Sequence, residues 1–229
     1  MEYFNSNCFK VSYSIRRYYV DKFYFKQIST LTDGSHILDL GGHKIQKRGF
    51  FNIENYKFRV FYLDINRIKH PDLIAEAEYI PIVGDKFSGV ICSEVLEHTY
   101  NPKHILKEIY RVLTDNGILL ATIPFLYRIH DDPTDYGRYT DQYWYRALQE
   151  AGYREIFIEH HGGFYSVLVD MYKQYINELW SRPFRDVAQW FLTKLQRTAL
   201  KKEEKIFVGD NQFLSSYTTG YGVIAKKQK

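Results

Sequence analysis

Short runs of apolar residues alternate along the chain with stretches in which apolar residues recur at helical spacing. Continuous apolar runs are typical of strands covered on both faces, and their alternation with helical patterns is typical of a mostly parallel sheet flanked by helices. The pattern therefore predicts an α/β fold with a doubly wound, seven-stranded, mostly parallel sheet.

The expected elements follow one another from residue 14 onward. Strands are predicted at residues 36–40, 60–64, 72–75, 89–93, 118–123, 153–158 and 220–225. Helices are predicted at residues 14–31, 102–113 and 141–151, and Asn116-Gly117 and Gly152 are expected to end the last two. Two further helical patterns, at residues 164–180 and 184–202, precede the last strand and predict a helical insertion.

The length of 229 residues suits one domain and is short for two units with separate cores. We expect four parts within this domain. They are an N-terminal helical segment (1–35), the sheet core (36–161), the helical insertion or lid (162–215), and a final strand with a basic tail (216–229).

Composition narrows the class of protein further. The net charge of +4 is too small to favour a nucleic-acid partner, and the 17% aromatic content is typical of a core rich in Phe and Tyr. The two cysteines, Cys8 and Cys92, lie far apart, which favours a reducing compartment and a cytoplasmic location. The longest apolar stretch, residues 118–127, is too short to span a bilayer.

Two predicted strands end in residues that suit a ligand. The first ends Asp39-Leu40-Gly41-Gly42, where small residues allow a close approach to backbone, and the second ends in Asp64. In open α/β sheets ligands bind beyond such strand ends, and an acidic residue there can accept hydrogen bonds from a ribose. The glycines do not match the G-x-G-x-x-G pattern of a pyrophosphate site, so a nucleoside without a pyrophosphate is the simplest ligand.

A series of short motifs follows in the next part of the chain. They are Ala75-Glu76-Ala77, Ser93-Glu94-Val95-Leu96-Glu97-His98, Asn101-Pro102 and Arg111-Val112-Leu113. From Ile37 to Ile158 the sequence resembles the type 11 family of class I S-adenosylmethionine-dependent methyltransferases. The resemblance implies a Rossmann-like methyltransferase fold, methyl transfer as the activity and S-adenosylmethionine as the cofactor.

The same resemblance assigns roles to individual positions. Those that would line the methionine part of the cofactor are Asp39, Gly41, Gly42, Ser93 and Glu94, with His98 expected one helical turn after Glu94. Those that would bind the nucleoside are Asp64 at the ribose and Ile65, Glu76 and Ala77 at the adenine.

Three histidine positions invite other interpretations. His43-Lys44 replaces the small residue that the family has after the first strand, which keeps open an inactive, methyltransferase-like binding module. Glu94 and His98 can instead form a helix-start pair, and no third ligand is evident for a metal, so none is expected. His160-His161 is interpreted as a solvated loop start, because adjacent strand residues point to opposite faces.

The loop at residues 124–140 lies where a methyl acceptor would meet the cofactor. Its histidine, proline, Asp-Tyr and Arg-Tyr-Thr residues are similar to a signature of methyltransferases linked to cell-surface glycan genes. We expect His130 to be the general base, with Asp135 as second choice, and Thr140 to cap the following helix. Tyr136, Arg138 and Tyr139 would position a small-molecule or glycan acceptor.

Two questions about partners stay open in the sequence. An RNA or protein methyltransferase is an alternative, although the Asn/Asp-Pro-Pro-aromatic motif of nucleic-acid methyltransferases is missing after the fourth strand. In the insertion, an apolar stripe with basic neighbours predicts a lid or homodimer surface, and secondarily a peripheral membrane contact. The stripe comprises Phe184, Val187, Ala188, Phe191, Leu192 and Leu195, with Trp180 and Trp190 in the same region.

Overall fold

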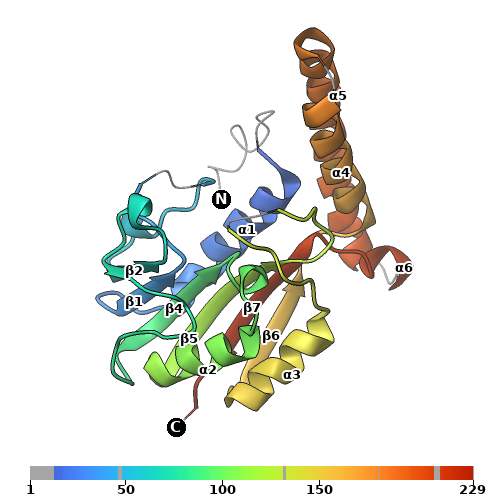
Figure 1. Cartoon of the computed structure of the whole chain (residues 1–229). Helices are drawn as coiled ribbons and strands as arrows, with labels where there is room; N and C mark the ends of the chain where they lie inside the picture. Colours follow the sequence, from blue (N-terminus) through green and yellow to red (C-terminus); the bar gives the residue numbers. More distant parts are fainter. Residues whose placement is uncertain (1–12, 46–47, 131–132, 180, 209–211, 229) are drawn as a thin grey trace.

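A computed structural model describes residues 13–45, 48–130, 133–179, 181–208 and 212–228 of the chain (Figure 1). Within these residues seven strands form one sheet in the order β3-β2-β1-β4-β5-β7-β6. Strand β7 is antiparallel to both of its neighbours, and the other pairings are parallel. The expected α/β class, with a mostly parallel seven-stranded sheet, is confirmed.

The strand order reverses around β1, which places the ligand-binding edge of such a sheet at the carboxyl ends of β1 and β4. The strands are β1 (His36–Leu40), β2 (Arg59–Asp64), β3 (Leu73–Ile74), β4 (Phe87–Ser93), β5 (Leu113–Pro124), β6 (Glu155–His160) and β7 (Gly220–Lys226). The loops that leave this edge therefore carry the candidate site.

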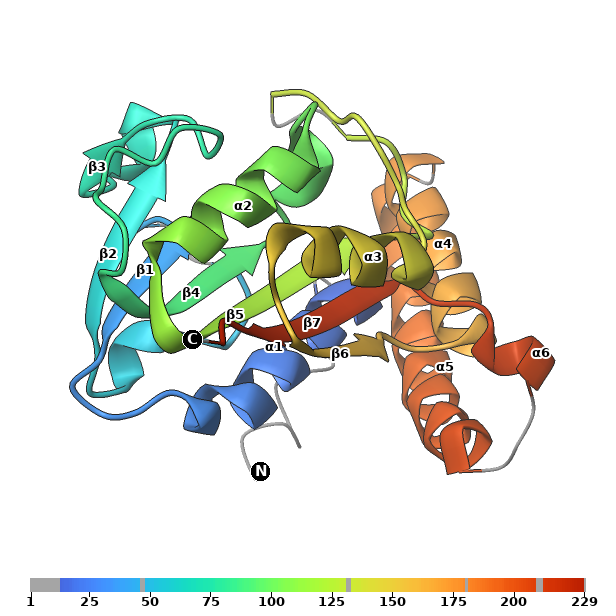
Figure 2. The same ribbon diagram turned by 90° about the horizontal axis from the view of Figure 1, so that it is seen from below.

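Helices cover both faces of the sheet (Figure 2). On one face α2 (Pro102–Val112) and α3 (Asp141–Ala151) bury Ile109 and Trp144 against the sheet, beside Leu38 and Val90. On the other face α1 (Ile15–Gln27) buries residues such as Phe23 against the sheet. Alternate residues along each strand thus feed two separate cores, as a doubly wound sheet requires.

Several predicted boundaries differ from the structure, two of them for a physical reason that the structure shows. The helix from Pro102 ends at Val112, and Asn116, at φ 60°, lies inside β5 instead of ending the helix with Gly117. The register of β5 against β4 shifts over this stretch, so the chain completes its turn within the strand. The sixth strand begins two residues late, because Tyr153 is buried in the core against Tyr110 before the strand starts.

The predicted insertion forms a helical hairpin that projects beyond the sheet (Figure 1). It consists of α4 (Phe164–Leu179) and α5 (Arg182–Val208), followed by the short α6 (Gln212–Ser215). Phe191 and Trp190 on α5 are exposed, whereas Leu192 is buried. Cys8 and Trp180 lie outside the described residues. Among those described, no helix has the length and apolar character needed to cross a membrane.

Candidate cofactor and acceptor site

The turn after β1 leaves no room for side chains at its two glycine positions. Gly41 has φ +75°, and a Cβ there would lie 2.3 Å from Val95 Cγ2. A Cβ on Gly42 would lie 2.1 Å from the Asp39 carboxyl carbon. The turn is fixed to the neighbouring strand because the Gly41 amide donates to the Leu63 carbonyl at 2.7 Å. Bare backbone therefore faces the carboxyl edge of the sheet beside an acidic side chain.

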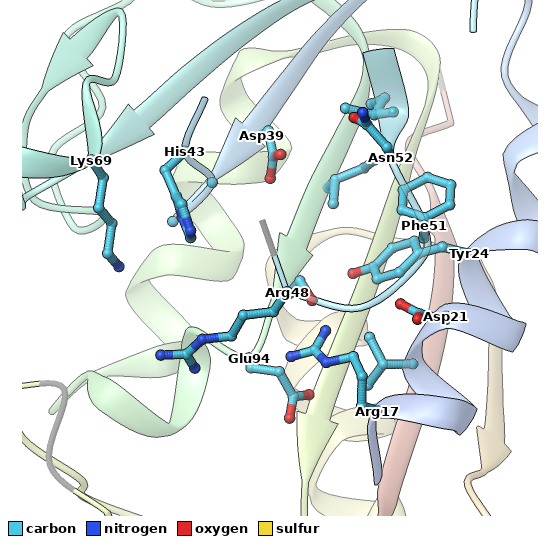
Figure 3. Close-up of a pocket in the computed structure, with 16 residues that line it drawn as sticks. Arg17, Asp21, Tyr24, Asp39, His43, Arg48, Phe51, Asn52, Lys69 and Glu94 are labelled. Atoms are coloured by element: carbon cyan, nitrogen blue, oxygen red, sulfur yellow. The ribbon is translucent and has the colours of Figure 1, made fainter. Parts of the chain in front are cut away.

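One pocket lies between this turn and α1 (Figure 3). Asp39, Gly42 and Ser93 line it from the sheet. Arg17 and Tyr24 line it from α1. The remaining wall comes from the segment between β1 and β2, through His43, Arg48, Phe51, Asn52 and Ile53. The pocket thus combines acidic, basic and aromatic groups, which suits a zwitterionic amino-acid moiety.

A second pocket lies over the ends of β1 and β2. It is lined by Asp64, Ile65, Glu76, Ala77 and His98, among others. Asp64 is buried, and its oxygens accept from the Asn66 amide at 2.6 Å and from Lys69 Nζ at 3.3 Å. Ile65 is 56% exposed and offers an apolar surface at the pocket wall. A buried carboxylate beside an exposed apolar side chain suits a ribose next to a flat base.

The two pockets together contain every predicted cofactor position. Gly41, Lys69 and Glu94 line both of them, so the pockets meet at the end of β1. The positions in question are Asp39, Gly41, Gly42, Asp64, Ile65, Glu76, Ala77, Ser93, Glu94 and His98. An amino-acid moiety and a nucleoside joined end to end fit this arrangement, although the role of each residue stays a prediction.

Glu94 is held by a contact that the sequence does not suggest. Its carboxylate forms a two-pronged ion pair with the buried Arg16 of α1, one prong being Arg16 Nε to Glu94 Oε2 at 3.1 Å. Burial opposes ionisation of Glu94, but the charge and hydrogen bonds of Arg16 outweigh it and hold its pKa below the usual range. The expected helical pair with His98 is wrong, because Glu94 has φ 55° and only a single 3₁₀ turn, Leu96–His98, follows.

The interpretation of His160-His161 as a solvated loop start is wrong for His161. Its side chain is 1% exposed, and Arg16 Nη1 lies 2.8 Å from its Nδ1. Burial, followed by the charge of Arg16, lowers the pKa of His161 well below its usual range, so the ring is neutral and accepts from Arg16. Arg16 therefore joins the end of β4 to the end of β6.

His130 and Asp135, the two candidate bases, lie in contact. The His130 amide donates to Asp135 Oδ2 at 3.0 Å, and His130 Nδ1 lies 3.3 Å from the same oxygen. Asp135 also receives both arms of the Arg138 guanidinium, Nη2 at 2.6 Å, which lowers its pKa to about 2. Asp135 is therefore an anchor that is ionised at neutral pH, and His130 is the remaining candidate for the base.

Glu97, which was not predicted as a site residue, lies beside both candidate histidines. The ligand atoms of Glu97, His98 and His130 lie within 4.8 Å of one another, a grouping hidden by the spacing along the chain. We call these three residues the histidine cluster. Burial and the nearby Glu94 raise the pKa of Glu97 well above its usual range.

The predicted acceptor-positioning residues divide into two groups. Tyr136 is half exposed and lines the second pocket. Tyr139 instead stacks on Tyr143, with ring centroids 4.1 Å apart, and packs against the core. Both terminal nitrogens of Arg138 donate to the Asp135 carboxylate, so they do not point toward an acceptor. Thr140 caps α3 as expected.

Helix α1 also contributes side chains to the first pocket, which the sequence did not predict. Arg17, Asp21 and Tyr24 line the first pocket, although this segment was interpreted only as a helix. The signal that could have revealed them is the run of polar residues on one side of an otherwise aromatic helix. Lys44, by contrast, forms an ion pair with Asp72 at the start of β3, which leaves His43 as the residue that lines the pocket.

Comparisons with known proteins agree with this geometry. Residues 55–121 match the family model described as a methyltransferase domain. A S-adenosylmethionine-dependent methyltransferase from Archaeoglobus fulgidus aligns with a TM-score of 0.57 and 17% identity, covering 92% of this chain and 94% of that one. Phosphoethanolamine N-methyltransferase 2 from Haemonchus contortus aligns with a TM-score of 0.55 and 12% identity, over 100% of this chain and 60% of that one.

A third similar structure is the cyclase SpnF, with a TM-score of 0.57 and 18% identity over 93% of this chain and 80% of that one. No curated protein matches the chain. Residues 55–121 thus match a methyltransferase domain, and the similar solved structures share the Rossmann-like fold, in agreement with the resemblance carried by the motifs. The family match is to the methyltransferase domain and lies in the sheet core, and it supports S-adenosylmethionine as the cofactor.

Proposed function

We propose that the protein transfers the methyl group of S-adenosylmethionine to a hydroxyl of a small-molecule or glycan acceptor, in the making of a cell-surface polysaccharide. The observation that carries this proposal is the continuity of the site. The second pocket, which holds the predicted nucleoside positions, is also lined by His98 and Tyr136, next to His130. An acceptor could therefore enter beside the cofactor.

The two pockets support the cofactor positions that the family resemblance implies. Asp39 and the Gly41-Gly42 backbone would hold the methionine end, with Asp39 facing its ammonium group. Asp64 would bind the ribose hydroxyls, and Glu76 and Ala77 the adenine edge. When bound, S-adenosylmethionine supplies a methyl group that is already activated, so the protein mainly has to align the acceptor and exclude water.

His130 would act as the general base for a hydroxyl acceptor. Its Nδ1 faces two acceptors, Asp135 Oδ2 at 3.3 Å and the Arg128 carbonyl at 3.2 Å. The Nδ1 proton is therefore held there, and Nε2 keeps the lone pair that can take a proton from the acceptor. Asp135 orients the ring and stabilises it once it is charged, as an anchoring carboxylate does in other bases.

Exposed tyrosines favour a sugar over an anionic acceptor. Because Arg138 is bound to Asp135, it is not free to fork onto a carboxylate or phosphate. Tyr100 and Tyr136 both line the second pocket, with rings 5.7 Å apart, and Tyr100 is 81% exposed. Flat, amphipathic rings of this kind can pack on the face of a sugar.

The test is transfer of label from S-adenosylmethionine carrying a tritiated methyl group. We expect purified protein to label a glycan or small-molecule fraction of cell extracts, and the Asp64→Ala variant to label it much less. Label found only in RNA or protein would favour those acceptors instead. Cofactor binding without label in any fraction would favour the inactive binding module.

The helical hairpin is proposed as a homodimer surface. Apolar and aromatic side chains on both helices are exposed, and exposed apolar side chains that gather on one surface commonly mark a contact. They are Leu168, Met171, Tyr172 and Tyr175 on α4 and Phe184, Val187, Trp190, Phe191 and Leu195 on α5. A peripheral membrane contact is the second candidate, favoured by Lys194, Arg197, Lys201 and Lys202 nearby. A cytoplasmic location stays a prediction from cysteine usage.

A further inference from the structure

Glu97 is a buried carboxylate without an evident role in methyl transfer. Its side chain is 0% exposed, and neither carboxylate oxygen has a hydrogen-bond partner from another residue. Buried carboxylates are normally paired, hydrogen-bonded or bound to a metal ion, because removing them from water is costly. Glu97 Oε1 lies 3.6 Å from His98 Nε2, too far for a hydrogen bond but directed at a ring nitrogen.

His98 presents its other nitrogen to the backbone. His98 Nδ1 lies 2.5 Å from the carbonyl oxygen of Thr134, which can only accept, so Nδ1 carries the proton and donates. The neutral ring then keeps its lone pair on Nε2, the atom that faces Glu97. Metal-binding histidines are usually oriented in this way, with the second ring nitrogen donating to a carbonyl or carboxylate.

His130 shows the same arrangement from a different loop. Its Nδ1 lies near the Arg128 carbonyl and Asp135 Oδ2, both of which accept. The rings of His98 and His130 meet edge to face, with centroids 5.0 Å apart. The charges next to the histidine cluster are themselves paired, Glu94 with Arg16 and Asp135 with Arg138, so Glu97 is the carboxylate left over.

The separations fit a small coordination sphere. Two ligands at about 2.0–2.1 Å from a tetrahedral ion lie roughly 3.4 Å apart. The 3.6 Å between Glu97 Oε1 and His98 Nε2 is already close to that value. The three ligand atoms lie within 4.8 Å of one another, so a small movement of the His130 side chain would complete the set.

We propose that Glu97, His98 and His130 bind a divalent transition-metal ion of the zinc type. Two imidazoles and one carboxylate select such an ion over Mg²⁺ or Ca²⁺, which prefer oxygen ligands. Three protein ligands leave a position open, as in zinc sites that bind water or a substrate. His98 lines the second pocket, so the ion would lie beside the space in which an acceptor is expected.

Metal binding does not depend on the proposed methyl transfer. The two uses of His130 exclude each other, because one Nε2 lone pair cannot bind an ion and accept a proton at the same time. The metal-bound and metal-free proteins would thus differ in the groups available to the acceptor.

Cobalt is the probe, because Co²⁺ bound by few ligands absorbs visible light far more strongly than the hydrated ion. The experiment uses the full, tag-free chain after chelator treatment, with Co²⁺ titrated by absorption and Zn²⁺ then added as competitor. The variants are Glu97→Gln, which keeps the side-chain size, and His98→Ala. His36→Ala is the matched control, since His36 lies at the start of β1, at the end of the strand away from the proposed site. Thermal melting checks that each variant folds.

We expect one Co²⁺ per chain, displaced by Zn²⁺, with affinity at least about tenfold weaker in both site variants and unchanged in His36→Ala. Absence of binding, or equal binding by wild type and Glu97→Gln, would overturn the proposal. Titration of the same samples with S-adenosylhomocysteine keeps the two proposals apart, because its failure to bind would contradict the methyltransferase function and leave the metal result intact.

Discussion

The glycine turn after β1 and the histidine cluster border the same pocket but are held by different kinds of contact. The turn is fixed by a backbone hydrogen bond from Gly41 to Leu63 and by the close approach of Val95. The histidine cluster joins a 3₁₀ turn to a loop more than thirty residues later, through side chains and the Thr134 carbonyl. Strand ends thus position the proposed cofactor-binding half, and side-chain contacts between loops position the proposed acceptor-binding half.

One strand end is held by a side-chain ion pair as well, and removal of this pair should change the free energy of unfolding more than any other substitution considered below. Glu94 directly follows β4 but is held by Arg16 from α1. In Arg16→Met the largely buried Glu94 carboxylate loses its buried partner, so we expect the free energy of unfolding to fall by about 3–5 kcal/mol. Urea unfolding measures it. The control is Lys26→Met, which removes an exposed pair with Glu159 and should cost less than about 1 kcal/mol. Equal losses in the two variants would contradict the account.

The second effect concerns the acceptor half alone. We expect His130→Ala to lower methyl transfer about a hundredfold, equivalent to about 2.7 kcal/mol, while cofactor affinity stays the same. Turnover with an identified acceptor and calorimetric titration measure the two quantities. Wild-type turnover in His130→Ala would show that the base lies elsewhere, and His36→Ala controls for loss of a histidine.

The residues held by strand ends could be predicted from the sequence, whereas those held by contacts between distant loops could not. Asp39, Gly41 and Asp64 were predictable because each lies at or next to the end of a strand pattern, and parallel strands end at one edge. Glu97 was not, because nothing in its spacing from His130 shows that a loop folds back over it. Arg16 was missed for the same reason, since both of its partners, Glu94 and His161, lie far along the chain.

A pH dependence tests the anchoring of the loop. The pKa of Asp135 is about 2 in the folded protein because Arg138 binds it, against roughly 3.9 when unfolded. Its contribution, about 2–3 kcal/mol, is therefore nearly complete above pH ~4 and is lost as the pH falls through about 2. We expect Asp135→Asn to be less stable than wild type at pH 6, by a difference that shrinks by roughly half at pH 3. A difference that stays constant in urea unfolding would contradict this assignment.

The helical hairpin belongs to neither half and should affect assembly only. We expect a dimer by light scattering, and Phe191→Glu to weaken it about tenfold by charging an exposed aromatic position. Thr198→Glu, an exposed position on the same helix with the same added charge, is the control. Flotation with anionic liposomes separates the alternatives. Salt-sensitive co-migration together with a monomer mass would replace the dimer by a membrane contact.

The most direct test of the account is calorimetric titration with S-adenosylhomocysteine. The wild-type protein should bind it with a Kd on the order of micromolar, because two adjoining pockets hold every predicted cofactor position. Asp64→Ala should bind about 1–3 kcal/mol more weakly, through loss of a charge-assisted ribose contact, and Asp33→Ala, at an exposed turn before β1, should bind like wild type. Absence of heat with wild type, or equal affinity of Asp64→Ala, would contradict the assignment of this edge as the cofactor site.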